Sequence, residues 1–283
     1  MPSKSIAEEE FQFMAVTKTS EIWRFVSSAI LSIVDEAYFE AGPKGLGFRS
    51  MDPSHIALID ISWPGIFFEK YECPSTIKFG LKISDFAKII KRINPKDLVE
   101  VRINGGDNTS LNIKTTGGYI RNYKMNLLTS SDEKSSPLPT LTFDSKMVIG
   151  ISALDKIMTD IQAIADNMTI ETIAGKNAVT FSGATENGSA LVVIDSNNIN
   201  KKSDTQEGEQ LEENPLLPVQ EVTVKENSKS SYHIDYISKI VKALAPSCNI
   251  ITLEYSSKKP LRLELVLLNT LKFQFFLAPR IDN

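Results

Sequence analysis

The sequence predicts an α+β protein of two similar domains, each a system of antiparallel strands with two helices on one side. One segment occurs twice without gaps, as ISDFAKIIKRINP at 83–95 and IDYISKIVKALAP at 234–246, and such a repeat indicates duplicated architecture. Each half also runs strand, helix, several strands, helix, several strands, and short turns between strands favour antiparallel sheets. The polar, Ser-rich stretch 129–139 separates the halves. We therefore assign one domain to residues 11–128, a linker to 129–139 and a second domain to 140–283.

In the first half, residues 20–37 carry an apolar stripe at helical spacing, with Ser20 as the expected N-cap. The repeated segment predicts a second helix over 83–94, with Ser84 as its expected cap. A turn at Asp52-Pro53-Ser54 separates two of the expected strands. The strands predicted from apolar alternation are 45–52, 55–63, 98–103, 110–115 and 119–128.

The second half restarts the same pattern after the linker. Residues 152–166 predict a helix that repeats the first one in the order of its apolar and basic residues, and 234–244 predict the second helix. Residues 196–219 are acidic and polar and predict a long exposed loop. The expected strands are 141–149, 168–174, 178–183, 190–195, 221–226, 250–256, 261–268 and 271–278.

Composition is that of an ordinary folded protein, with 42% hydrophobic and 23% charged residues. No apolar run approaches the roughly 20 residues that span a bilayer, so no membrane partner is expected. The only two cysteines, Cys73 and Cys248, lack metal or redox spacing, which favours free thiols in a reducing, intracellular setting. The net charge of −4 arises in the acidic segment 201–226, so the rest of the chain is balanced and can still carry a basic face.

The repeated helices carry basic residues away from their apolar faces. Lys88, Lys91 and Arg92 are spaced i, i+3 and i+4 and so share one side of a helix. Lys239 and Lys242 repeat this spacing in the second half. Such a pair on one helix is usually an ordinary solvated face. Its repetition instead predicts one basic surface presented twice to the same partner.

Catalytic and cofactor motifs are missing from the sequence. It has no HExxH, Walker or GxSxG pattern, and its two histidines, His55 and His233, are far apart. We therefore expect no enzyme activity, no cofactor and no metal. The competing interpretation is a nucleic-acid hydrolase that uses Asp52 and His55, but the Asp-Pro-Ser sequence favours a turn that His55 supports.

Several motifs resemble the proliferating cell nuclear antigen family, the sliding clamps of archaeal and eukaryotic DNA polymerases. The resemblance runs from about Phe13 to the end of the chain. Its most specific parts are FRSMDPSHIAL at 48–58 and LAPRI at 277–281, joined by FEKYEC at 68–73, GL at 80–81 and KKPL at 258–261. The resemblance implies a closed ring of three subunits, with helices lining a central hole and sheets outside.

The family resemblance assigns the basic residues to DNA. It implies that helices of both domains face duplex DNA, held without sequence specificity through its phosphates. The expected DNA-binding residues are Arg24, Lys88, Lys91, Arg92, Lys156, Lys239 and Lys242.

The resemblance also implies a pocket in which client proteins insert a short hydrophobic motif. The expected clients are the clamp loader, DNA polymerase, flap endonuclease and DNA ligase. Phe276 is expected to point outward into this pocket, unlike Phe275, because side chains alternate along a strand. The pocket positions are Met51, His55, Ile56, Leu138, Pro139, Pro260, Phe276, Ala278 and Pro279.

Subunit contacts in the family join one edge strand of each domain. The matching strands are 119–127 and 188–194, with Tyr119, Arg121, Tyr123, Gly188, Ala190 and Val192 as interface residues. The partners are copies of the chain or paralogues, so a subunit of a mixed or checkpoint-type ring is the alternative. The resemblance places the protein on DNA inside the cell, in the cytoplasm and nucleoid of an archaeon or the nucleus of a eukaryote.

Overall fold

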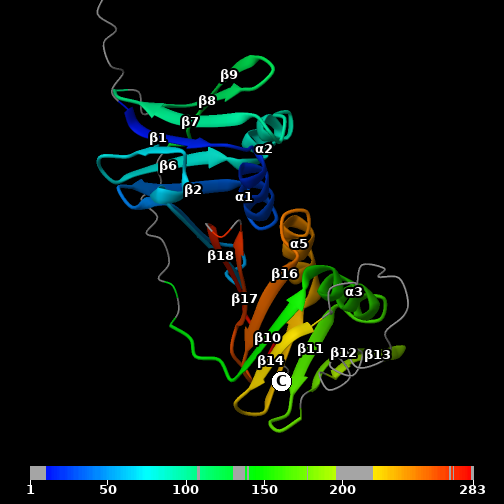
Figure 1. The fold of residues 1–283 in the computed structure, drawn as a ribbon. Coiled ribbons are helices and arrows are strands. Elements are labelled where there is room, and N and C mark those ends of the chain that lie inside the picture. The colour runs from blue at the N-terminus through cyan, green and yellow to red at the C-terminus, as the bar shows by residue number, and fades with distance from the viewer. Residues whose placement is uncertain are drawn as a thin grey trace, which may run out of the picture. The chain divides into compact units, whose positions relative to one another are not determined.

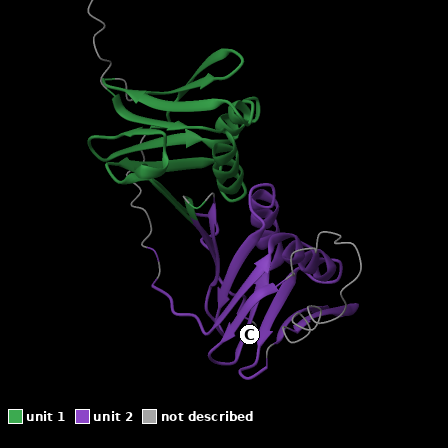
Figure 2. Ribbon diagram, viewed as in Figure 1, with its two compact units in different colours: residues 1–50, 60–136, 268–272 green, residues 51–59, 137–267, 273–283 purple. Residues whose placement is uncertain are grey.

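The computed structural model describes residues 11–106, 109–129, 138, 140–176, 178–195, 219–267, 269 and 271–281. The chain separates into two compact units, one of residues 1–50, 60–136 and 268–272 and the other of residues 51–59, 137–267 and 273–283 (Figure 2). Among the described residues, each unit has two α-helices that pack together and a set of antiparallel strands (Figure 1). The predicted α+β class with two similar domains is confirmed, while the linker 129–139 falls mostly outside the described residues and its limits stay a prediction.

Unit 1 is built on a five-stranded antiparallel sheet in the order β5-β1-β7-β8-β9, so that β9 lies at one edge. A second group of strands follows the order β4-β3-β2-β6. The elements of this half of the chain are β1 (Phe11–Thr17), α1 (Glu21–Leu31), β2 (Glu36–Gly42), β3 (Gly45–Met51), β4 (Ala57–Pro64), the short helix η1 (Gly65–Phe67), β5 (Lys70–Glu72), β6 (Ile77–Lys82), α2 (Ile83–Lys91), β7 (Leu98–Asn104), β8 (Ser110–Thr116) and β9 (Ile120–Asn126).

Unit 2 repeats this plan with a four-stranded sheet in the order β13-β12-β11-β15, in which β13 is an edge strand. Its second group of strands follows the order β14-β10-β16-β17-β18. The elements of this half are β10 (Ser145–Gly150), α3 (Ile151–Gln162), β11 (Asn167–Thr172), β12 (Ala178–Thr185), β13 (Gly188–Asp195), β14 (Val219–Val224), β15 (Ser228–His233), α5 (Ile234–Leu244), β16 (Ile250–Tyr255), β17 (Leu261–Leu267) and β18 (Leu271–Leu277).

The repeated segments fold as the equivalent helices α2 and α5. Their apolar residues recur at helical spacing and are buried, as Ile83, Phe86 and Ile90 show in α2. Each such side chain contributes roughly 1.5–3 kcal/mol when it leaves water. α2 packs against α1, and α5 packs against α3. α3 also lies close to β12, where a Cβ on Gly183 would come within 2.6 Å of the Ile161 side chain, so only glycine fits.

The structure has one of the two expected N-caps at the expected position, though without the capping hydrogen bond, and differs at the other. Ser20 stands at the N-cap position of α1, but its hydroxyl donates to the Asn94 carbonyl at 3.2 Å and does not cap the helix. Ser84 lies inside α2, whose first turn is capped from outside. The Asp35 carboxylate accepts the backbone N–H of Ser84 at 2.8 Å, and the Asp35 carbonyl accepts that of Ile83 at 2.7 Å. Because this cap comes from a residue distant in sequence, the local pattern could not reveal it.

The helix predicted over 20–37 is shorter in the structure. It ends at Leu31, and residues from Glu36 onward form β2, which pairs with β3 and β6. Similarly, the helix predicted over 152–166 ends at Gln162. Strand pairing at 36–42 competes with the helical pattern and prevails there, because β2 has a hydrogen-bonded neighbour on each side, which satisfies its backbone groups.

Candidate nucleic-acid and partner interfaces

The repeated lysines lie on the exposed sides of α2 and α5. Lys88 and Lys91 are exposed on α2, opposite its buried residues, and Lys239 and Lys242 take the equivalent places on α5. Lys88 forms an ion pair with Asp85 at 2.9 Å, and this hydrogen bond raises the pKa of Lys88 and lowers that of Asp85. The pair is fully exposed, so salt screens it and the ammonium group is available to another anion.

Arg24 and Lys156, expected at matching places in the other two helices, have different surroundings. Lys156 is exposed on α3. The half-buried Arg24 instead donates to two carbonyls at the end of α2, those of Lys91, at 3.4 Å, and Ile93. A third carbonyl there, that of the exposed Arg92, accepts from Arg121 at 2.9 Å. Arg24 therefore caps the C-terminal end of α2 and does not extend into solvent.

Asp52 is the centre of the turn that connects β3 to β4. Its carboxylate accepts the backbone N–H groups of Ser54, Ile56 and Ala57 at 3.0, 2.8 and 2.7 Å. The hydroxyl of Tyr236, on α5, donates to the same carboxylate at 3.1 Å. Burial alone would raise the pKa of Asp52, but these hydrogen bonds outweigh it and lower the pKa below its ordinary value. Asp52 therefore serves the turn and lacks the free carboxylate that a hydrolytic base requires.

The expected client pocket has several of its residues around this turn. His55 is exposed with a φ of 58°, and the Ile56 carbonyl accepts the N–H of Ala278 at 2.8 Å, which joins the turn to the segment after β18. Pro139 lies outside the described residues. The remaining positions, Met51, Leu138, Pro260, Ala278 and Pro279, are half-buried.

Phe276 contradicts the expectation that it points outward. Its side chain is 4% exposed, and Phe275 is fully buried. The last five residues of β18 are all buried, although successive side chains point to opposite faces of the strand. This end of β18 is therefore covered on both faces. Alternation along the sequence therefore could not assign an outward face here.

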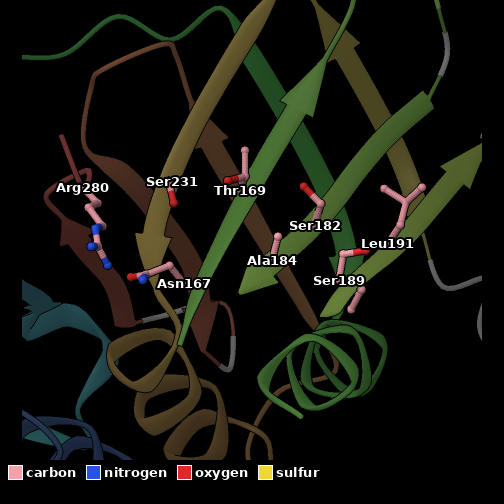
Figure 3. Close-up of a pocket in the computed structure, with 10 residues that line it drawn as sticks. Asn167, Thr169, Ser182, Ala184, Ser189, Leu191, Ser231 and Arg280 are labelled. Atoms are coloured by element: carbon pink, nitrogen blue, oxygen red, sulfur yellow. The ribbon is translucent and has the colours of Figure 1, made fainter. Parts of the chain in front are cut away.

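A depression of about 500 Å³ is lined mainly by residues of the four-stranded sheet of unit 2 (Figure 3). Its lining combines hydroxyl and amide side chains with Arg280, whose backbone N–H donates to the Ser231 carbonyl at 2.8 Å. None of the described residues that line it is Asp, Glu, His or Cys, so they supply neither a general base nor an activated nucleophile. These residues are Asn167, Thr169, Ser182, Gly183, Ala184, Ser189, Ala190, Leu191, Ser231 and Arg280.

The two strands expected at subunit contacts, β9 and β13, are both sheet edges. Tyr119 is exposed, with Arg121 stacked on its ring at 4.2 Å. The other expected interface residues, Tyr123, Gly188, Ala190 and Val192, are half-buried. Within β9 and β13, the exposed large apolar side chains are instead their neighbours Ile120, Leu191 and Val193. Sequence reasoning missed these three, although the two-residue alternation of a strand would have indicated them.

Two further features of the described residues concern membranes and metals. No helix among them is long and apolar enough to cross a membrane. Nor do the described His, Cys, Asp and Glu residues gather into a group of three or more that could hold a metal ion.

Comparison with known proteins identifies the family. Residues 13–134 match the N-terminal domain model of proliferating cell nuclear antigen (PCNA), and residues 137–280 match the C-terminal domain model. The DNA polymerase sliding clamp of Nitrosopumilus maritimus is 40% identical over 271 residues, which cover 96% of this chain and 99% of that protein.

Solved structures share the fold. PCNA from Thermococcus kodakaraensis superimposes with a TM-score of 0.82 at 20% identity, over 95% of this chain and 100% of that one. A. fulgidus PCNA, bound to the C-terminal region of FEN-1, gives a TM-score of 0.78 at 24% identity, over 96% and 99% of the two chains. The chain thus belongs to the PCNA family of DNA polymerase sliding clamps, non-catalytic processivity factors, and is most similar to archaeal members.

Proposed function

We propose that three subunits, all copies of this chain or together with paralogues, close into a ring that encircles duplex DNA and tethers replication and repair proteins to it. The observation that supports this proposal best is the repetition of the lysine pairs, Lys88 with Lys91 and Lys239 with Lys242, on equivalent helices of the two units. Ammonium groups bind phosphates without reading bases, which suits a ring that slides.

The proposed DNA-binding set is these four lysines with Arg92 and Lys156. Arg24 has a supporting place, because its guanidinium group is held by the backbone at the end of α2. The logarithm of the affinity for DNA falls linearly with the logarithm of the salt concentration. Removal of one lysine that binds a phosphate should make this slope less steep by roughly 0.9.

Clients dock, in this proposal, at the turn Met51–Ala57 and the adjoining segment Ala278–Pro279. Clamp loader, polymerase, flap endonuclease and ligase compete for the site through a short hydrophobic motif. Exposed Ile56 and half-buried Met51 supply apolar contact, and methionine adapts to side chains of different shape. The protein acts on DNA inside the cell.

The experiment measures DNA synthesis by a polymerase on a primed circular template with a clamp loader. Lys88→Ala, Lys91→Ala, Lys239→Ala and Lys242→Ala are combined in one variant. We expect wild type to increase product length strongly, and the variant to lose most of this stimulation and to bind duplex DNA with a flatter salt dependence.

The matched control removes the same number of positive charges elsewhere. Lys44, Lys70, Lys225 and Lys258 are exposed lysines outside the helices, and their combined replacement by Ala should leave stimulation near wild type. If the helix variant and the control behave alike, the lysines of α2 and α5 are not the DNA contacts.

A further inference from the structure

The turn Met51–Ala57 owes its conformation to one buried carboxylate. Asp52 is 3% exposed and accepts four hydrogen bonds, three of them from N–H groups of the turn itself. The Asp52 N–H also donates to the Ala57 carbonyl at 2.9 Å, which closes the turn. His55 has a left-handed φ of 58°, a conformation that is uncommon for residues other than glycine.

The fourth hydrogen bond differs from the others because it comes from outside the turn. The Tyr236 hydroxyl belongs to α5, 184 residues later in the chain, and lies 3.1 Å from Asp52 Oδ2. The three internal bonds shape the turn but do not fix where it lies on unit 2. That place is set by the Tyr236 bond on one side and by the bond from Ala278 to the Ile56 carbonyl on the other.

Tyr236 is itself held in place. The His233 ring meets its ring edge-on at 6.0 Å, and Lys239 Nζ lies 5.8 Å from its ring centre, within the range of a cation–π contact. Burial, followed by the hydrogen bond to Asp52, raises the pKa of Tyr236, so the phenol remains a donor at neutral pH. One side chain thus contacts both the client turn and a lysine of the proposed DNA surface.

From this geometry we infer that Tyr236 is a positioning residue for client binding. Its hydroxyl holds the turn Met51–Ala57 in the conformation that a client peptide meets, so the peptide does not have to order it. The inference rests on the proposed client site. Pre-organisation of this kind increases affinity by removing an ordering cost. Loss of the hydroxyl should therefore weaken peptide binding by roughly tenfold to a hundredfold, as expected for one lost hydrogen bond to a charged group.

The test compares Tyr236→Phe with Tyr71→Phe. Both variants lose only a hydroxyl. That of Tyr71 donates to the Gly42 carbonyl at 2.8 Å in unit 1 and also interacts with Cys73, as that of Tyr236 also interacts with Ser54. Affinity is measured by fluorescence anisotropy with a labelled peptide that carries a short hydrophobic client motif. Hydrogen exchange of the Ser54, Ile56 and Ala57 amides reports on the turn itself. We expect Tyr236→Phe alone to weaken binding and to speed exchange at these amides.

A double-mutant cycle with Asp52→Asn separates positioning from general destabilisation. If Tyr236 acts through Asp52, adding Tyr236→Phe to Asp52→Asn should change affinity little further. Wild-type affinity and exchange in Tyr236→Phe would overturn the inference, and so would full additivity in the cycle. If the wild-type protein does not bind the peptide, the proposed client site is wrong, and so is the role of Tyr236 in client binding. If amide exchange in the turn is the same in Tyr236→Phe as in wild type, Tyr236 does not hold the turn in place.

Discussion

At the scale of single residues, Asp52 shows how a buried carboxylate can stabilise a turn through its charge. Its hydrogen bonds favour the ionised form, so its pKa in the folded protein lies below the ordinary value of 3.8. A lowered pKa means that the unfolded chain binds the proton more readily. The stabilisation from Asp52 is therefore complete above the ordinary pKa and is lost as the pH falls through the folded value.

Asp52→Asn should accordingly lower the free energy of unfolding by about 1–3 kcal/mol at pH 7, because several donors then face a weaker acceptor. The difference from wild type should narrow as the pH falls below about 4, since protonation weakens the wild-type acceptor too. Urea unfolding at pH 7, 5, 4 and 3 measures both. Glu69→Gln, which removes an exposed partner of Lys18 at 3.0 Å, should change stability much less. If the difference in unfolding free energy between wild type and Asp52→Asn does not change with pH, the ionised Asp52 carboxylate is not what stabilises the turn.

At the scale of elements, the C-terminal end of α2 depends on two arginines from other elements. The last carbonyls of a helix have no partner within it. Here Arg24 of α1 donates hydrogen bonds to the carbonyls of Lys91 and Ile93, and Arg121 of β9 donates one to the carbonyl of Arg92. Positive charge at this end also complements the helix dipole. The segment that presents Lys91 and Arg92 is thus fixed by its neighbours.

We therefore expect Arg24→Met to act on stability rather than on DNA. It should lower the free energy of unfolding by about 1–2 kcal/mol through the lost cap, with little change in the salt dependence of duplex binding. Lys156→Met, at the exposed matching position of α3, should change the free energy of unfolding little and should flatten the salt dependence of duplex binding. Thermal unfolding and salt titrations on both variants decide between the roles. A flatter salt dependence with normal stability in Arg24→Met would make Arg24 a DNA contact, as the sequence suggests.

At the scale of the whole molecule, the sequence predicts the features that repeat and misses those that depend on distant partners. The helices α2 and α5 are predictable because apolar spacing is a local signal, and α5 begins and ends where predicted. The Asp35 cap of α2 and the Tyr236–Asp52 bond join residues remote in sequence, so no local pattern contains them. The prediction for Phe276 is wrong because alternation assumes one solvated face, and β18 has none at its end.

The edge strands β9 and β13 are the surfaces through which copies of the chain could assemble. In the part of the chain that the structure describes, each of them has a neighbouring strand on one side only, and Tyr119, Ile120, Leu191 and Val193 are each more than half exposed around them. Such edges normally invite aggregation. Two different edges on one chain can instead pair head to tail with the edges of other subunits, and this heterologous contact forms a ring when the rotation closes.

If the two edges are complementary to each other, the purified chain should form a trimer with three times its mass of 31.4 kDa. Basic Arg121 and Lys124 on β9 and acidic Asp195 at the end of β13 favour such self-pairing. Leu191→Asp should then dissociate the trimer, because it buries an unpaired charge in the contact. Val266→Asp is the control, since Val266 is exposed on β17, a strand inside its sheet. Light scattering at micromolar concentration measures the mass. A wild-type monomer or dimer would mean that the ring requires a paralogue.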